Sequence, residues 1–152
     1  MVFEHLFILR RVEPWLRSRQ NRLVKTPRLH FLDSGLLAAT LGITTARLAI
    51  DRTILGPLLE AFAFSEILKQ AQWFDESCAL HHFRDKDQDE VDVVVENSAG
   101  AIVGVEVKAA ATVSPADFRG LRMLANAGDC CVFCSFGSLK CQPMQNQNPC
   151  CS

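Results

Sequence analysis

The sequence predicts an α/β domain in which a mixed central sheet is flanked by helices. Two stretches with alternating valines, residues 91–95 and 103–107, lie on either side of a turn at residues 97–100, which is the pattern of a β-hairpin. A long apolar helical segment precedes these strands, and a second helix followed by an apolar stretch comes after them. A strand, a helix and a further strand in that order place the two strands parallel, so the sheet is expected to be mixed.

Length and composition are those of one ordinary globular domain. The chain has 152 residues, of which 49% are hydrophobic and 22% are charged, enough to bury a core. The formal net charge of −1 demands no polyanionic or membrane partner. No apolar run approaches the roughly 18 residues of a membrane span, and residues 6–9 are too short for the core of a signal peptide. We therefore expect a soluble, cytoplasmic protein.

Charge and composition divide the chain into three segments. Residues 1–50 form a basic N-terminal segment, residues 51–136 carry the predicted core, and residues 137–152 are rich in Cys, Gln and Asn and are predicted to be disordered. Acidic side chains gather at residues 85–96. A basic end and an acidic middle indicate a polyanion-facing patch and a cation-attracting pocket, or simply two solvated surfaces.

The N-terminal half shows short elements and then one long helix. Residues 6–32 are predicted to be short extended pieces joined by a basic loop. Asp33 or Ser34 caps a short helix over residues 35–42, which ends at a glycine, and residues 43–53 are predicted to be a connector. A helix over residues 55–73 is apolar nearly all round, which predicts burial on several sides.

The remaining elements complete the predicted core. Strands are expected over residues 78–83, 91–96 and 101–108. The run Ser114-Pro115-Ala116-Asp117 is an acidic variant of a capping box and starts a helix that ends at residue 128. Residues 130–135 are the fourth strand candidate.

Cysteines crowd into the end of the chain. Cys78 stands alone in an apolar stretch and is expected to be a buried small hydrophobe. Cys131 and Cys134 have the spacing of a metal or redox pair, but no second such pair and no His lie nearby. No zinc site is therefore expected, although zinc and disulfides both stay open as alternatives. The six clustered cysteines are Cys130, Cys131, Cys134, Cys141, Cys150 and Cys151.

Four charged residues are the candidate catalytic set. Glu106 and Lys108 are two apart on a strand and share a face, and the preceding strand brings Asp92 beside them. Glu60 has no cation one helical turn away, whereas Glu66 can pair with the nearby Lys69. Carboxylates among valines are costly unless they are paired or bound to a metal. Two interpretations stay open, a divalent-metal site and a salt bridge from Lys108 to one of the acids.

These residues, in this order, resemble a known superfamily. Glu60 on a helix, Asp92, and then Glu106-Val107-Lys108 on a strand look like the PD-(D/E)XK nucleases, whose restriction-endonuclease-like core has the order αβββαβ. More closely, residues 3–129 resemble the C-terminal domain of unknown function found in many prokaryotic AAA+ family ATPases. The matching segments are residues 25–37, 56–62, 83–84, 90–92, 105–109 and 114–121.

The resemblance implies roles for the candidate set. Asp92 and Glu106 would hold Mg²⁺ or Mn²⁺, Glu60 would support the metal or its water, and Lys108 would orient the attacking water. Five cations would contact a DNA backbone or dock the ATPase module. They are Arg17, Arg19, Arg22, Lys25 and Arg28.

The sequence also departs from the pattern of the family. Val91 replaces the usual Pro, and the likeness is expected to stop near Asp129. No Gly-x-x-x-x-Gly-Lys-[Ser/Thr] motif occurs, so a fragment or stand-alone remnant of the ATPase is expected. Both metal-dependent hydrolysis of DNA and a non-catalytic DNA- or protein-interaction module of an ATPase remain open.

Overall fold

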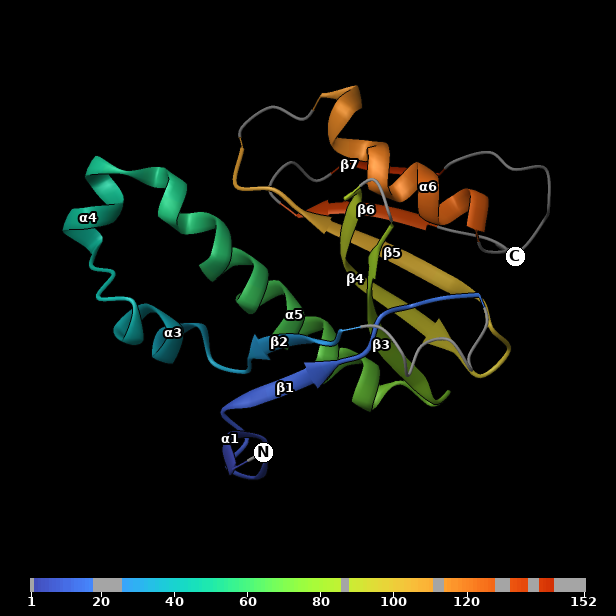
Figure 1. The fold of residues 1–152 in the computed structure, drawn as a ribbon, viewed down its shortest axis with the longest axis horizontal. Helices are drawn as coiled ribbons and strands as arrows, with labels where there is room; N and C mark the ends of the chain where they lie inside the picture. The colour runs from blue at the N-terminus through green and yellow to red at the C-terminus, as the bar shows by residue number, and fades with distance from the viewer. Residues whose placement is uncertain are drawn as a thin grey trace.

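The centre of the fold is one five-stranded sheet, shown in Figure 1, with the strand order β3-β4-β5-β6-β7. The strands are β3 (Cys78–Arg84), β4 (Glu90–Asn97), β5 (Ile102–Val107), β6 (Val132–Phe136) and β7 (Lys140–Pro143). Neighbours pair antiparallel except β5 and β6, which pair parallel. The predicted mixed sheet is confirmed.

The computed structural model describes residues 2–17, 26–85, 88–110, 114–127, 132–136 and 140–143, the last two by their backbone. Among these residues no helix combines the length and the apolar character needed to cross a membrane. The side chain of Cys78 is half-buried and its thiol is free. The cysteine pair Cys131 and Cys134, which the sequence left without an assigned role, lies outside the described side chains.

Helix α5 (Leu55–Trp73) covers one face of the sheet, with the bounds that the sequence predicts (Figure 1). Its Phe64 is fully buried and clusters with Val93 and Val105 of the sheet and with Val12 of the N-terminal segment. The predicted burial on several sides holds only for part of the helix, because Phe62 and Trp73 are 42% and 82% exposed.

Helix α6 (Arg119–Ala127) covers the opposite face and makes the crossover from β5 to β6 (Figure 1). It follows a 3₁₀ turn, η2 (Pro115–Phe118), which the predicted Ser114–Asp117 capping box begins. Leu121 and Leu124 are fully buried and pack in one cluster with Val91 and Ile102. The helix comes very close to β4, because a Cβ atom on Gly120 would lie 2.0 Å from the carbonyl oxygen of Glu90.

A bulge interrupts β4 beside the candidate site. The register with β3 shifts between His81 and Phe83, so that β4 contains one extra residue there. The alternating valines predicted one shared face, but Val91 packs against α6, whereas Val93 packs against α5. This part of the prediction is wrong, because a period of two assumes a regular strand and the bulge at Asp92 resets it.

The N-terminal segment forms a small antiparallel hairpin beside the main sheet. The segment begins with α1 (Val2–His5), and the hairpin pairs β1 (Leu9–Val12) with β2 (Arg28–Phe31) so that Arg10 lies opposite His30. The chain after β1 then runs along the edge of β3. The backbone N–H of Trp15 donates to the backbone carbonyl of His82 at 2.6 Å, and the backbone N–H of His82 donates to the backbone carbonyl of Glu13 at 3.2 Å. This strip anchors the N-terminal segment to the core.

Two short helices occupy part of the predicted connector. The predicted short helix is α3 (Ser34–Thr40), and Asp33 caps it by accepting from the Leu36 N–H at 2.8 Å. Residues 43–53 were predicted to be a connector, but they contain α4 (Thr45–Ile50) and most of a 3₁₀ turn, η1 (Arg52–Ile54). The side chains of Thr44 and Asp51 cap these two elements. Thr44 and Asp51 are residue types that commonly begin a helix, so they were the sequence signal for these two elements.

The last strand lies where the sequence indicated no regular structure. The segment 137–152 was predicted to be disordered, yet β7 lies inside it and pairs antiparallel with β6. Polar composition concealed this strand, because an edge strand gains its stability from backbone pairing and needs little apolar pattern.

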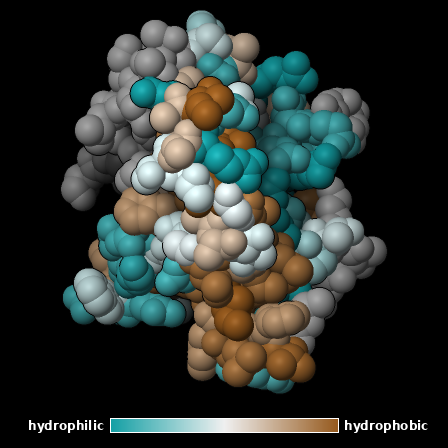
Figure 2. Space-filling model, turned by 90° about the vertical axis from the view of Figure 1, so that its left-hand side faces the viewer, coloured by the Kyte–Doolittle hydropathy of each residue, from teal (hydrophilic) through white to brown (hydrophobic). Residues whose placement is uncertain are grey.

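Apolar side chains remain exposed at the N-terminal end. Figure 2 shows them as the brown group at the bottom of the view, where α1 lies. Phe7 is 81% exposed and has a positive φ of 55°, a conformation that strains a bulky residue. The other members of this apolar group are Val2, Phe3 and Leu6.

Candidate functional site

The four predicted catalytic residues meet at one end of the sheet. Glu60 comes from α5, Asp92 from the bulge of β4, Glu106 from β5, and Lys108 from the residue after β5. All four line one pocket, which the start of α5 and the turn before α6 close on two sides. The sequence therefore identified residues that the fold does bring together.

The bulge of β4 directs Asp92 toward the end of β5. One carboxylate oxygen, Oδ2, accepts a hydrogen bond of 2.8 Å from the backbone N–H of Val107. Its side chain is only 13% exposed. Burial raises the pKa of Asp92, against the opposing effects of the Val107 hydrogen bond and of Arg28.

Glu106 and Lys108 form an ion pair. The Lys108 ammonium lies 2.7 Å from Glu106 Oε1. The other oxygen, Oε2, is buried and has no hydrogen-bond partner among the described residues. Burial, with the nearby charge of Asp92, raises the pKa of Glu106 to about 7, although Lys108 opposes the shift.

Glu60 lines the pocket beside the sheet and Glu66 does not, as the sequence predicts. Glu66 Oε1 lies 2.5 Å from the Lys69 ammonium at the surface. Burial and the charge of Asp92 raise the pKa of Glu60. The sequence has no cation one helical turn from Glu60, but the fold brings one from 32 residues away in the sequence. Arg28 Nη1 lies 3.2 Å from Glu60 Oε1.

Arg28 is the residue that the sequence interpretation misplaced. It was grouped with a basic surface for DNA or a partner module, but its guanidinium lies among the acids. Nη1 also lies 3.4 Å from Asp92 Oδ1, and Nη2 forms an ion pair with Glu90 Oε2. Glu90, the first residue of β4, in turn lies 3.0 Å from Arg84 Nε. The contact between Arg28 and Asp92 joins residues that are 64 positions apart, so no local sequence pattern predicts it.

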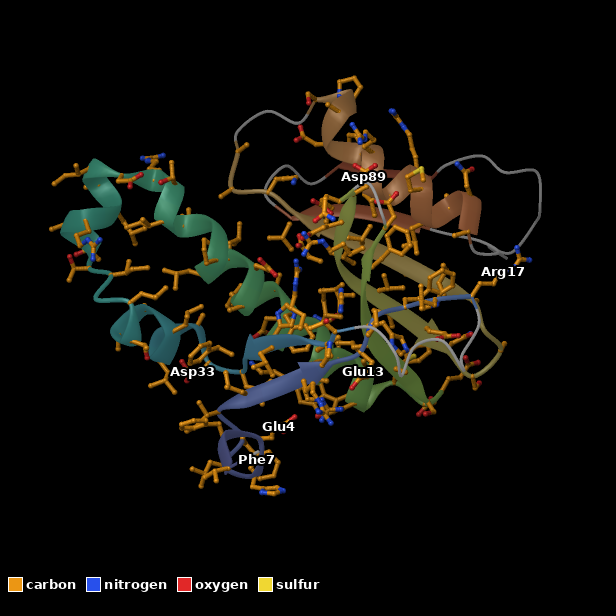
Figure 3. All side chains as sticks on the ribbon, viewed as in Figure 1. Glu4, Phe7, Glu13, Arg17, Asp33 and Asp89 are labelled. Atoms are coloured by element: carbon orange, nitrogen blue, oxygen red, sulfur yellow. The ribbon has the colours of Figure 1, made fainter. Side chains whose placement is uncertain are left out.

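Arg17 is the one other member of the predicted basic group that lies in the described residues, and it does not line this pocket. Arg17 is exposed, and Figure 3 shows it well apart from Asp89, a residue that lines the pocket. The three remaining members, Arg19, Arg22 and Lys25, lie outside the described residues.

The described geometry does not fit a divalent metal centre. In the part of the chain that the structure describes, no three His, Cys, Asp or Glu side chains are grouped to hold a metal ion. Arg28 and Lys108 instead contact the acids that would serve as ligands. Carboxylates that are already neutralised by hydrogen-bonded cations have little electrostatic need for Mg²⁺ or Mn²⁺.

Comparisons with known proteins identify two matched segments. Residues 55–142 match a domain of unknown function, DUF4143, and residues 1–47 match a second domain of unknown function, DUF8612. The first match passes the predicted limit near Asp129 and reaches into β7. Arg28 thus lies in one matched segment and its acidic partners lie in the other.

The chain is also similar to two mycobacterial proteins. Uncharacterized protein Mb2031c of Mycobacterium bovis and uncharacterized protein Rv2008c of Mycobacterium tuberculosis are each 32% identical over 107 residues. The match covers 70% of this chain but only 23% of each relative, so the chain spans less than a quarter of their length. No solved structure matches. Because the match to residues 55–142 takes in more than half of its length, the chain belongs to the DUF4143 family.

Proposed function

We propose that this domain is a non-catalytic interaction module of an AAA+ ATPase, which binds DNA or a protein partner on a core related to the PD-(D/E)XK nucleases. One observation carries the proposal. Arg28 contacts Glu60, Asp92 and Glu90, where a hydrolytic site of this kind would need free carboxylates.

The charges of the pocket argue in the same direction. The carboxylates of Glu60, Glu90, Asp92 and Glu106 are each in contact with a cation of the chain itself. A nucleic-acid backbone carries negative charge and is repelled by carboxylates, so this pocket is a poor place for it. Contact with DNA or with the ATPase would instead use the basic side chains of the N-terminal segment.

Hydrolysis of phosphodiesters is the second candidate function. It is favoured by the unpartnered Oε2 of Glu106, a buried acceptor in the same pocket as Asp92 and Lys108. This function requires Arg28 to leave the carboxylates first.

Three variants separate the two candidates. Glu106→Ala and Lys108→Ala are tested beside Lys69→Ala, which breaks a comparable pair at the surface, Lys69–Glu66. If the domain is a non-catalytic module, neither the wild type nor any of these variants should cleave single-stranded or branched DNA in the presence of Mn²⁺. The wild type should also show no saturable calorimetric binding of Mn²⁺ below about 1 mM.

The opposite outcome is equally specific. An enzyme would cleave DNA as the wild type, would lose cleavage in Glu106→Ala, and would be slowed by roughly 10²–10³-fold in Lys108→Ala, the usual effect of one electrostatic group at a developing charge. Unchanged cleavage by Lys69→Ala would then assign the loss to the pocket.

A further inference from the structure

The guanidinium of Arg28 occupies the part of the acidic pocket that a cation would be expected to fill. Nη1 lies 3.2 Å from Glu60 Oε1 and 3.4 Å from Asp92 Oδ1, so one nitrogen bridges a helix and a strand. The second nitrogen, Nη2, pairs with Glu90. A planar group with several N–H donors can contact three carboxylates at once, which a single ammonium cannot do as well.

The N-terminal hairpin holds Arg28 in this position. Arg28 is the first residue of β2, which pairs with β1, and the strip after β1 is bonded to β3 through Trp15 and His82. The side chain of Arg28 is 27% exposed. Although burial opposes it, the charges of Glu60 and Glu90 raise the pKa of Arg28, so the guanidinium stays charged.

Without this guanidinium, Glu60 and Asp92 would have no ion-pair partner among the described residues, because the other cations near the pocket pair elsewhere, Lys108 with Glu106 and Arg84 with Glu90. Glu106 is 7% exposed and lines the same pocket, and one of its oxygens has no hydrogen-bond partner in the part of the chain that the structure describes. Carboxylates held close together repel unless a cation or a proton intervenes, and a divalent cation with oxygen ligands meets that need. Such a cation and Arg28 would compete for the oxygens of Glu60 and Asp92.

We propose that Arg28 is a tethered counter-ion of the acidic pocket. It belongs to the segment matched as residues 1–47, and it closes the pocket in the segment matched as residues 55–142 to divalent cations. This inference rests on the proposed function, because it names what keeps the pocket from acting as a metal centre. Binding of a cation and docking of β2 are then linked reciprocally, and each weakens the other.

The direct test measures binding of Mn²⁺ alone by calorimetry, with no substrate. Arg28→Met removes the charge and keeps the length of the chain, and Arg28→Lys keeps the charge but loses the fork of donors. The control is Arg11→Met, which removes an exposed arginine of β1 that also lies near two glutamates, Glu4 and Glu13. We expect Arg28→Met to bind Mn²⁺ at least roughly tenfold more tightly than the wild type, a coupling of ordinary size.

Further variants assign the gain to the pocket. The gain should disappear when Asp92→Asn is added to Arg28→Met, should be smaller in Arg28→Lys, and should be absent in Arg11→Met. A folded Arg28→Met protein that binds Mn²⁺ no better than the wild type overturns the inference and leaves the proposed function standing. Cleavage of DNA by the wild type contradicts the proposed function, whereas a gain in Arg28→Met would still support the counter-ion.

A second measurement uses the wild type and covers the case in which Arg28→Met fails to fold. Amide hydrogen exchange of residues 28–31 is followed as Mn²⁺ is raised, with K⁺ at equal ionic strength as the control. Displacement of Arg28 should speed exchange in β2 while leaving β4 unchanged. The titration extends to about 100 mM Mn²⁺, far above the range in which the closed wild-type pocket is expected not to bind. Exchange in β2 that does not respond to Mn²⁺ even at that concentration overturns the inference.

Discussion

The Lys108 ammonium lies 2.7 Å from one carboxylate oxygen of Glu106, while the other oxygen of that carboxylate is buried without a partner among the described residues. The carboxylate is thus only half satisfied. Its pKa rises to about 7, chiefly because of burial and the charge of Asp92. Glu106 therefore titrates well above the ordinary range of a carboxyl in the folded protein, and its protonation contributes to the pH dependence of stability.

The stability that Glu106 contributes should fall as the pH rises from about 4.5 to about 7. A carboxyl whose folded pKa is raised contributes stability that is complete below its ordinary value of 4.5 and is lost as the pH passes about 7. The difference between these two values corresponds to up to about 3 kcal/mol. Burial lowers the pKa of His30 and of His82 to about 4, so these two groups make stability rise with pH over the same range in both proteins. Glu106→Gln should remove only the opposing loss, so in urea unfolding the variant should gain more stability than the wild type between pH 5 and pH 8. An equal pH dependence in wild type and variant would assign it to other groups.

Glu60→Gln should stabilise the protein slightly at neutral pH. Burial and Asp92 raise the pKa of Glu60 despite its contact with Arg28, so the charge at this position is a net cost. Because the pair is partly exposed, the gain should be at most about 1 kcal/mol. The control is Glu66→Gln on the same helix, whose partner Lys69 lies at the surface, and its effect should be near zero. Destabilisation by Glu60→Gln would show that the contact with Arg28 outweighs the repulsion.

Gly120→Ala should be strongly destabilising. The added Cβ would lie 2.0 Å from the carbonyl oxygen of Glu90, a backbone atom that cannot turn aside, so α6 would have to move off β4. We expect a loss of about 2 kcal/mol or more in denaturant unfolding. Gly56→Ala is the matched control, because a Cβ there meets nothing within 4 Å at the start of α5. That change should be neutral or mildly stabilising.

Phe7→Gly should stabilise the N-terminal end. Phe7 has a φ of 55° and is 81% exposed, so glycine relieves backbone strain and sacrifices little buried surface. The strain of one L-residue in this conformation is roughly 1–2 kcal/mol, and the extra chain entropy of glycine in the unfolded state offsets roughly 0.5–1 kcal/mol of it, so the expected net gain is about 0.5–1 kcal/mol. Phe7→Ala keeps the strain and serves as the control. A melting temperature lowered by Phe7→Gly would show that the aromatic ring contributes contacts that outweigh the strain.

Local patterns in the sequence determined much of the fold. The capping residues Asp33 and Ser114 each preceded a helical element, and the apolar run of residues 55–73 gave α5 its bounds. The β4–β5 hairpin and the parallel pairing of β5 with β6 followed from valine periodicity and from the intervening helix. These features depend on neighbours within a few residues or on a simple rule of connection, so a linear pattern carries them.

Tertiary structure alone decided the rest, because it depends on contacts between distant parts of the chain. The bulge that turns Asp92 toward Val107 arises where β4 meets its neighbours, and no periodicity announces it. The placement of Arg28 against Glu60 depends on a hairpin that packs beside the sheet. From the sequence, Glu60, Asp92, Glu106 and Lys108 could be grouped as one site. The cation that pairs with Glu60 and Asp92, however, is Arg28, from a segment that the sequence assigned to a separate basic surface.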